Sequence, residues 1–538
     1  MMEEPLVRDG DEGFPFGVNK FDRATLLARG TVQDATNALV ADNFFIRTRP
    51  GADALTGAAW GAATQLQGVW YFDAPTNVEY LLTATAGVFK KFDGTSSSAA
   101  AGWTADASAR IEAAQLGSLL YLSDSVNAWR TWDGTTFNTM GTTETEVGDP
   151  PVGATMLIEH NGRMFAAGRA AEPDALWASD PLSAVTGKWN HVRFKFNVTA
   201  GDGQAIRALA SMTRRWLAVF LEDGIAVYDT PADAVAAVST AGETAFTKVF
   251  QARGVNCVGR RAVATSGTTL YFIGDDGIRR LRPQDATEDR VEVTPPLSRP
   301  MQPYIDRINW SAAGTSCAVK YEHYVLFAVP LDAATQPSHV LVFNERLDSW
   351  MGVWTGWAPV QFVVSRFAGV QRLCFADTAG RVNRWKDTNT GTEAETLDAT
   401  FTENSVDVAT SISLRSLTFG EPDSPKLPKH WTVDFVDTRN NAVTVGWWSD
   451  EELLKAEVID VPQSGIVFPI VLPITMPQAQ VRRVRRPIVG LLLPGLQQPI
   501  TEFREAFLKI TTARGKVCVR RAELTATLGA LEEDETAI

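Results

Sequence analysis

Hydrophobic and polar residues alternate through the middle of the chain in a pattern that repeats seven times between about residue 68 and residue 390. Each repeat contains an alternating apolar run, a turn of Gly, Asp or Asn, and a second short run that often begins Gly-Val or Gly-Ile. Two such runs joined by a turn are typical of β-hairpins. Their period of two is that of strands, and helix-period patterns are almost absent.

Equivalent points in successive repeats are about 41 to 62 residues apart, near the spacing of four-stranded blades. We therefore predict an all-β fold in which residues 61–390 form a β-propeller of about seven blades. A split or degenerate blade would make the number six or eight. The points taken as equivalent are Val88, Trp129, Leu176, Ile225, Ile278, Val340 and Val382.

Large aromatic residues recur near the second run of the repeats or just after it. Flat side chains of this size fit between the faces of neighbouring twisted blades, where each buries on the order of 150 to 250 Å². We expect them to form the packing between blades, and the alternative is an exposed platform for a ligand. The residues are Trp129, Trp132, Trp177, Trp189, Tyr228, Trp350, Trp354 and Trp385.

Residues 1–60 are rich in Gly, Asp and Arg and predict an extended arm that docks on the propeller. The one plausible helix covers residues 31–43, with Ala38, Leu39 and the nearby Phe44 facing a core. Alternation after Phe44 predicts a strand that ends at a Pro50-Gly51 turn. Arg47 and Arg49 are expected to anchor this arm to the first blade.

The repeated pattern of the blades does not continue in residues 391–538. Four strands are predicted between about 396 and 450 and two more between about 506 and 528, which suggests a separate β-sandwich. The sandwich carries an apolar insertion, residues 461–500, whose repeated prolines argue against a central strand or a regular helix. Exposed apolar surface of this size is rare on monomers, so a neighbouring subunit is expected to cover it if the rest of the monomer does not. The candidate contacts are Ile466, Val467, Phe468, Leu491, Leu492 and Leu493.

The same insertion contains the one dense cluster of positive charge in the chain, the run VRRVRRP. Arginine makes bidentate, weakly hydrated contacts, so the cluster is a candidate contact for an acidic partner surface or for DNA phosphates. The simpler alternative is a solvated loop. The four arginines are Arg482, Arg483, Arg485 and Arg486.

Composition indicates a soluble, folded chain, because hydrophobic residues make up 45% and charged residues 21%. The net charge of -13 argues against a general nucleic-acid binder, although DNA could still slide past an acidic wall. The N-terminal residues lack the apolar stretch of a signal peptide, so synthesis in a cytoplasm is expected. The most apolar segments, 465–477 and 487–495, are short and broken by proline, so no membrane span is predicted.

No motif in the chain predicts a catalytic residue, a metal site or a cofactor. The five histidines form no HExxH motif, and neither a phosphate-binding glycine loop nor G-x-S-x-G occurs. The four widely spaced cysteines are expected to be buried thiols. The acidic groups at Glu222-Asp223-Gly224 and Asp275-Asp276-Gly277 fall where hairpins must reverse, and Asp-Gly is a preferred turn dipeptide. We interpret both as turns.

The order of several segments resembles the β-propeller tail proteins of tailed bacteriophages. This family includes the nozzle or hub proteins at the distal end of short podoviral tails, also described as packaged-DNA stabilisation or tail tubular proteins. The resemblance covers most of the chain. It rests on DATNALVADNFFIRTRPGADAL, LWASDP with Trp189 after it, LYFIGDDGIRRL, VFNERLDSWMGV and RSLTFGEPDSPK.

The resemblance implies a structural virion protein without enzymatic activity, made in the bacterial cytoplasm and located in the phage tail. Its implied partners are further copies in a ring, most simply a hexamer, the adaptor or head-tail connector ring, and a tail fibre, spike or needle. Double-stranded DNA would pass through the ring as non-specific cargo, with the protein retaining the genome until ejection. The competing interpretation is a virion propeller that binds or cleaves host glycans. Cleavage would require two inward carboxylates about 5 to 10 Å apart in a cleft at the propeller axis.

Overall fold

The structure is a computed structural model of the chain. It describes residues 6–386 except 42, 56–59, 61–65, 77, 193, 200–202, 232–245, 285–289 and 368. Farther along it describes 402–403, 406–417, 419, 426–436, 441–449, 452–461, 481–487, 507–513 and 516–528. The fold is all-β, as the alternating pattern predicts. Among the described residues no helix is long and apolar enough to span a membrane.

The middle of the chain folds into successive antiparallel units of four strands. The first two are β6 (Leu66–Asp73), β7 (Glu79–Thr85), β8 (Val88–Phe92) and β9 (Ser97–Thr104), then β10 (Glu112–Leu116), β11 (Leu119–Ser123), β12 (Arg130–Trp132) and β13 (Phe137–Thr139). The next two are β14 (Met156–His160), β15 (Arg163–Arg169), β16 (Glu172–Ala178) and β17 (Lys195–Asn197), then β18 (Ile206–Ser211), β19 (Trp216–Leu221), β20 (Gly224–Asp229) and β21 (Thr247–Arg253).

Three more units follow. They are β22 (Val263–Ser266), β23 (Thr269–Gly274), β24 (Gly277–Pro283) and β25 (Val291–Val293), then β26 (Cys317–Tyr321), β27 (Tyr324–Val329), β28 (His339–Asn344) and β29 (Ser349–Trp354), then β30 (Pro359–Phe367), β31 (Val370–Asp377) and β32 (Val382–Trp385). The last unit obtains its fourth strand, β5 (Ala52–Ala54), from the N-terminal arm. Short helices η2 (Arg299–Met301), α1 (Gln302–Ile305) and η3 (Trp310–Thr315) lie between β25 and β26.

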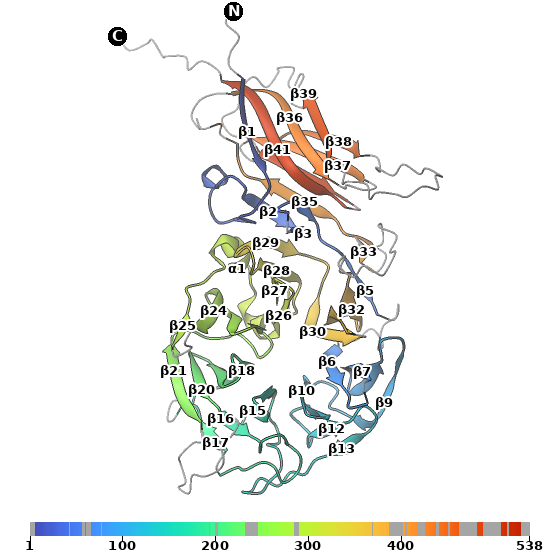
Figure 1. The fold of residues 1–538 in the computed structure, drawn as a ribbon, viewed down its shortest axis with the longest axis vertical. Coiled ribbons are helices and arrows are strands. Elements are labelled where there is room, and N and C mark those ends of the chain that lie inside the picture. The colour runs from blue at the N-terminus through green and yellow to red at the C-terminus, as the bar shows by residue number, and fades with distance from the viewer. Residues whose placement is uncertain are drawn as a thin grey trace, which may run out of the picture.

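The first strands of neighbouring units contact one another in the cyclic order β6, β10, β14, β18, β22, β26, β30 and back to β6. The units therefore form a closed, propeller-like ring (Figure 1). Each residue taken as equivalent in the sequence repeats lies on the third strand of its unit, except Trp129, which lies directly before β12. The repeat in the sequence is thus the repeat in the structure.

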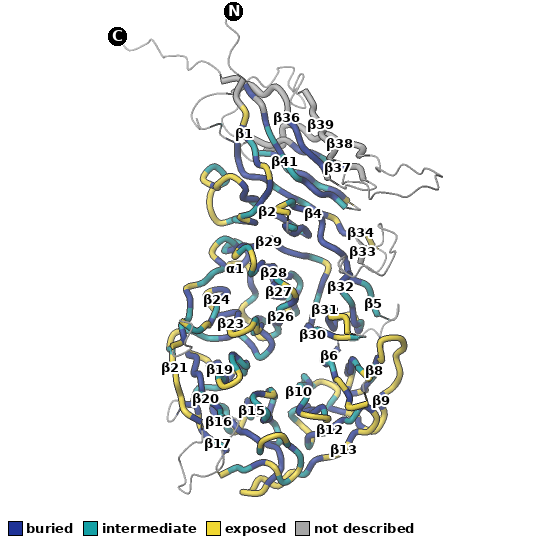
Figure 2. Tube along the Cα trace, in the orientation of Figure 1, coloured by how far each residue is buried: buried dark blue, intermediate teal, exposed yellow. Residues whose placement is uncertain are grey.

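Aromatic side chains pack inside the ring units and between them, as the sequence predicts. All eight recurring aromatic residues are buried (Figure 2). Trp129 meets Trp189 edge to face with ring centroids 5.4 Å apart, and Trp354 lies 5.5 Å from Trp385. The platform alternative does not apply to these residues, because buried rings cannot receive a ligand.

The N-terminal arm differs from its prediction. Residues 31–43 form no helix but two strands, β2 (Val32–Thr36) and β3 (Ala38–Val40), separated by Asn37 with a φ of 55°. The strands form because β2 pairs with β29 and β35 (Thr410–Leu414), and β3 with β4 (Ile46–Thr48). Tertiary hydrogen bonding thus overrides a local pattern that suited a helix. The arm also contains β1 (Leu6–Glu12) and η1 (Ala24–Leu26).

The prediction of core residues in the arm is partly confirmed. Ala38 and Leu39 are buried, whereas Phe44 is 42% exposed. The arm is also shared among other units, because β1 and β4 pair with β41 (Cys518–Leu528) and β5 pairs with β32. Residues 1–60 therefore form no separate unit.

Arg49 anchors the arm, although not to the first unit of the ring. Its guanidinium is fully buried and donates to Asn37 Oδ1 (3.0 Å), to the Pro50 carbonyl (3.1 Å) and to the Thr355 carbonyl (2.7 Å). The group also lies over the rings of Trp354 and Trp357, 5.4 and 5.0 Å from their centroids. Thr355 and Trp357 lie in the connection between β29 and β30, and Trp354 is the last residue of β29, so Arg49 joins the arm to the last two units.

The C-terminal part contains more strands than predicted. Besides β35 and β41 they are β33 (Thr402–Glu403), β34 (Val406–Asp407), β36 (Lys426–Val436), β37 (Asn441–Ser449), β38 (Glu452–Val461), β39 (Val481–Pro487) and β40 (Phe507–Thr512). β39 lies within the insertion 461–500, where no strand was predicted, and pairs along its length with β36. It is the last strand in the order of its sheet among the described residues, so it does not contradict the expectation against a central strand. A strand is allowed there because residues 481–486 contain no proline.

The described strands of this region lie in two large sheets and in a small two-stranded sheet of β33 and β34. One has the order β3, β4, β41, β36, β39, with β1 also on β41. The other is the continuation of a ring unit, in the order β26, β27, β28, β29, β2, β35, β40, β37, β38. Alternate residues of both sheets, such as Val433 and Phe435 on β36 and Leu508 and Ile510 on β40, belong to one buried apolar cluster. That cluster extends into the ring, so the ring and the C-terminal region share a core.

Replacing Arg49 with Met tests the anchor. The variant should lose about 3 kcal/mol or more of unfolding free energy, because buried carbonyl and amide oxygens lose their donors. Urea unfolding followed by tryptophan fluorescence measures the loss. Arg23→Met is the matched control, because Arg23 is exposed and makes no side-chain hydrogen bond among the described residues. Equal stability of the two variants would contradict the anchoring role.

Candidate functional site

The predicted interface residues fall into a described and an undescribed group. Arg482, Arg483, Arg485 and Arg486 lie on β39, so they form part of a strand and not a solvated loop. β39 is the last strand in the order of its sheet among the described residues. Ile466, Val467, Phe468, Leu491, Leu492 and Leu493 lie outside the described residues.

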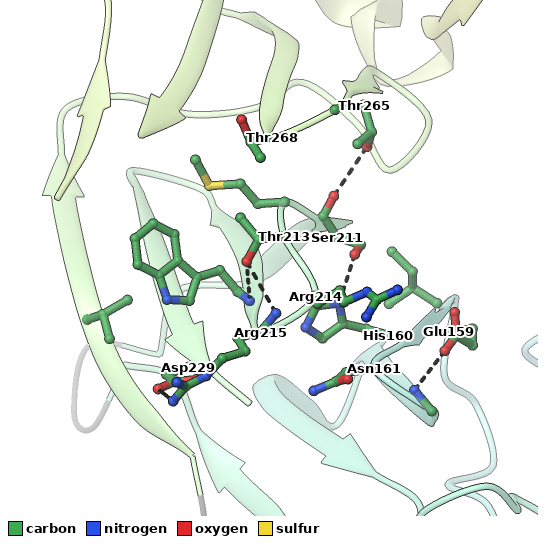
Figure 3. Close-up of a pocket in the computed structure, with 16 residues that line it drawn as sticks. Glu159, His160, Asn161, Ser211, Thr213, Arg214, Arg215, Asp229, Thr265 and Thr268 are labelled. Carbon is green, nitrogen blue, oxygen red and sulfur yellow. Dashed lines mark hydrogen bonds and ion pairs between the residues drawn. The ribbon is translucent and has the colours of Figure 1, made fainter. Parts of the chain in front are cut away.

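A pocket of about 1240 Å³ opens on one face of the ring (Figure 3). Three hairpin turns surround it, between β14 and β15, between β18 and β19, and between β22 and β23. The first turn is Asn161-Gly162, in which both residues have positive φ. Asn-Gly is favoured in such a turn because it accepts this backbone geometry and matches the twist of the strands.

A hydrogen-bonded chain of polar side chains forms the floor of the pocket. His160 Nδ1 lies 2.8 Å from Ser211 Oγ, and Thr265 Oγ1 donates to the Ser211 carbonyl at 3.5 Å. His160 is only 1% exposed, and this burial lowers the pKa of its imidazole below the usual 6.5. The imidazole is therefore neutral at physiological pH and serves the packing of two neighbouring units.

The rim of the pocket carries charges that are only partly paired. Arg215 donates from Nε to Asp229 Oδ1 at 2.9 Å and makes a second ion pair with Oδ2. Glu159 Oε1 accepts from the Gly162 amide at 2.8 Å. Arg214 is exposed and has no ion pair among the described residues. The half-buried ring of Trp216 completes the wall, so the pocket offers donors, acceptors and one aromatic surface.

The two acidic turns have the structural role that the sequence predicts. Glu222 and Asp223 connect β19 to β20, and the Gly254 amide donates to Asp223 Oδ1 at 3.1 Å. Asp275 and Asp276 connect β23 to β24, and Asp276 forms an ion pair with Arg279. Both acidic dipeptides thus lie in the turns between paired strands.

The ring axis carries arginines where a glycosidase would need a pair of acids. Arg260 and Arg261, before β22, each place Nε 2.9 Å from Oε1 of Glu112 on β10. The Glu112 carboxylate is therefore engaged in ion pairs with both guanidiniums. Among the described residues no group of three or more acidic, Cys or His side chains could hold a metal ion.

Sequence reasoning missed this axial cluster. The dipeptide Arg260-Arg261 was visible, but its partner Glu112 lies about 150 residues earlier. Only closure of the ring brings the two together. The four cysteines, in contrast, are buried free thiols as expected, and burial raises the pKa of Cys374 to about 11.

Comparison with known proteins gives no further assignment. No protein-family model matches the chain, and no curated protein is a significant match. Functional inference therefore rests on the residues and geometry described above.

The buried imidazole predicts a pH effect. Because the pKa of His160 is lowered in the folded state, its contribution to stability is present above about pH 6.5 and is lost as the pH falls through the folded value. Urea unfolding at pH 7.5 and pH 5.0 should show a smaller acid-induced loss for His160→Asn than for the wild type. An identical loss in both proteins would contradict a neutral buried imidazole.

Proposed function

We propose that the chain is a structural virion protein that forms the distal ring, the nozzle or hub, of a phage tail. In this proposal it is a seven-bladed β-propeller joined to a β-sandwich, with no enzymatic activity and no cofactor. Six four-stranded sheets and the first four strands of the nine-stranded sheet would be the blades. The observation that carries the proposal is the continuity of that nine-stranded sheet, because it makes the two regions one rigid block.

The way in which the ring and the C-terminal region are joined supports a rigid structural subunit. β2 of the arm pairs with β29 of the ring on one side and with β35 of the C-terminal region on the other. Gly352 on β29 lies so close to the Ala35 carbonyl that any Cβ would collide with it. Such close backbone contact leaves little freedom for a hinge.

The strand β39 is the proposed contact between copies or with the adaptor ring. A strand at the end of a sheet presents backbone donors and acceptors that another chain can pair with. Four arginines on this strand would attract an acidic neighbour, and the chain itself carries a net charge of -13. A closed ring of copies, most simply a hexamer, meets both conditions, with a tail fibre, spike or needle as further partners.

Double-stranded DNA is the proposed cargo of the assembled ring. Arg261 crosses the axis of the single propeller, so the DNA path would run between copies. An acidic lumen would repel the phosphates and keep DNA from adhering during ejection, and salt would weaken this effect.

Replacing the four arginines of β39 with Ser tests the ring proposal. We expect the wild type to form a closed ring by light scattering and negative-stain microscopy. The variant should keep its β-sheet circular dichroism but assemble at least roughly tenfold more weakly, since about 1.4 kcal/mol of lost contact energy is enough for that.

The control for this experiment replaces with Ser four arginines that lie elsewhere and are exposed, Arg23, Arg29, Arg214 and Arg282. Because it removes the same charge elsewhere, this variant should assemble like the wild type. A monomeric wild type, or equal loss of assembly in both variants, would contradict the proposed contact.

Glycan binding is the second candidate function, and the pocket in Figure 3 favours it. The pocket lining contains both donors and acceptors, such as Arg214 and Glu159, which suit the neighbouring hydroxyls of a sugar. The indole of Trp216 can stack on the sugar ring. The charges of the lining arginines and carboxylates balance, so the pocket suits a neutral glycan better than a phosphate polymer.

Titration calorimetry with maltotetraose, cellotetraose and chitotetraose tests this function. If the pocket binds glycans, at least one should bind, and Trp216→Ala should weaken it roughly tenfold. Trp310→Ala is the control, because Trp310 is 40% exposed and lies outside the pocket. If none of the three oligosaccharides binds, glycan binding is ruled out as the function of the pocket. Release of sugar from any of them would indicate a glycosidase.

A further inference from the structure

Arg261 lies on the axis of the ring. It precedes β22, yet its Nη2 donates to the carbonyls of Ile111 (2.7 Å) and Gln67 (3.2 Å), and its Nη1 to that of Val360 (3.4 Å). Val360 and Gln67 are on β30 and β6, and Ile111 directly precedes β10. These strands lie two or three positions away around the ring, so the side chain crosses the centre.

Two more guanidiniums gather around the same point. Arg260 shares Glu112 Oε1 with Arg261 and also donates to the Thr155 carbonyl. Arg110, two residues before Glu112, contacts the carbonyls of Gly314 (3.3 Å) and Thr315 (3.4 Å). Gly314 in turn packs on Gly259, the neighbour of Arg260: a Cβ on Gly259 would lie 2.7 Å from the Gly314 oxygen.

The cluster has three positive charges and one negative charge. Glu112 is the only carboxylate among the described residues that acts on Arg260, and the other acceptors are uncharged carbonyls. Two positive charges are therefore uncompensated in a chain that is acidic overall. Partly buried charges of like sign repel strongly, because little water screens them.

The titration behaviour of the arginines agrees with this charge count. Burial, followed by repulsion from Arg261 and Arg260, lowers the pKa of Arg110 to about 9. Burial also lowers the pKa of Arg260 to about 10, although Glu112 opposes the change. The folded protein thus holds charges that a bound anion would stabilise.

The geometry points to an anion-binding site formed by Arg110, Arg260 and Arg261, with a small multivalent oxyanion of the phosphate class as its ligand. Two uncompensated charges match a divalent anion better than chloride. Guanidinium groups also present paired N–H donors that fit the oxygens of a phosphate. Arg110 would be the solvent-facing member, because its contacts to carbonyls are long and it is less buried than Arg261.

Thermal unfolding of the full chain tests the site. Sodium chloride, phosphate and pyrophosphate are compared at equal ionic strength and pH 7.5. Phosphate and pyrophosphate should raise the midpoint by roughly 2 °C or more relative to chloride, because a ligand that binds only the folded state stabilises it. Titration calorimetry should give one pyrophosphate per chain. Equal midpoints in all three salts would overturn the proposal.

Variants separate binding from general ion effects. Arg110→Gln should abolish the phosphate-specific shift and be at least as stable as the wild type in chloride, because it removes a repelled charge. Arg110→Lys retains the charge and should keep part of the shift. Arg307→Gln is the matched control, since Arg307 is an exposed ring arginine paired with Asp332, and it should keep the full shift. An unchanged shift in Arg110→Gln would place the anion elsewhere and overturn the proposal.

A titration with DNA distinguishes a free phosphate ligand from the phosphates of a nucleic acid. A 12-base-pair duplex is titrated at the same total phosphate concentration as the free anion. The duplex should not compete with pyrophosphate, because the Arg261 side chain crosses the axis at this site. Binding of the duplex alone, lost in Arg110→Gln, would assign the cluster to nucleic acid and contradict the small-anion proposal.

Discussion

The fold depends on the N-terminal arm, which closes the ring and joins it to the C-terminal region. A chain that builds a ring from its middle must connect the last unit to the first, and here β5 supplies the missing strand of the last unit. Three residues before β5, the buried Arg49 fixes the arm through three carbonyl and amide oxygens and two tryptophan rings. Upstream, β2 extends the sheet of the preceding unit into the C-terminal region. One segment therefore sets the geometry of both parts.

A second set of arginines connects the opposite sides of the ring. Arg261 reaches three units that lie across the axis, and its backbone carbonyl accepts from the Ala318 amide at 2.7 Å. Aromatic packing holds each unit to its neighbours, whereas these long polar side chains act over the diameter. The same charges that connect the units repel one another, which is why a structural cluster is also a candidate ligand site.

The sequence was informative wherever structure is local. Alternation located the third strand of every ring unit, and turn dipeptides such as Asp276-Gly277 were correctly distinguished from acidic sites. Prediction was wrong where the partner is remote. Residues predicted to form a helix, 31–43, contain strands instead, because their partners β29 and β35 lie more than 300 residues later. β39, which pairs with β36, is a strand that was not predicted. The axial cluster forms only when the ring closes, and no sequence motif predicts that closure.

We propose that copies of this chain form the distal ring of a phage tail, and cryo-electron microscopy of the assembled particle that carries the chain is the decisive experiment. We expect a closed ring at the tail end, with β39 at a contact with a neighbouring copy or with the adaptor ring, and a DNA path between the propellers. Isolated copies projecting from the particle, with β39 facing solvent and the pocket of Figure 3 outward, would contradict it.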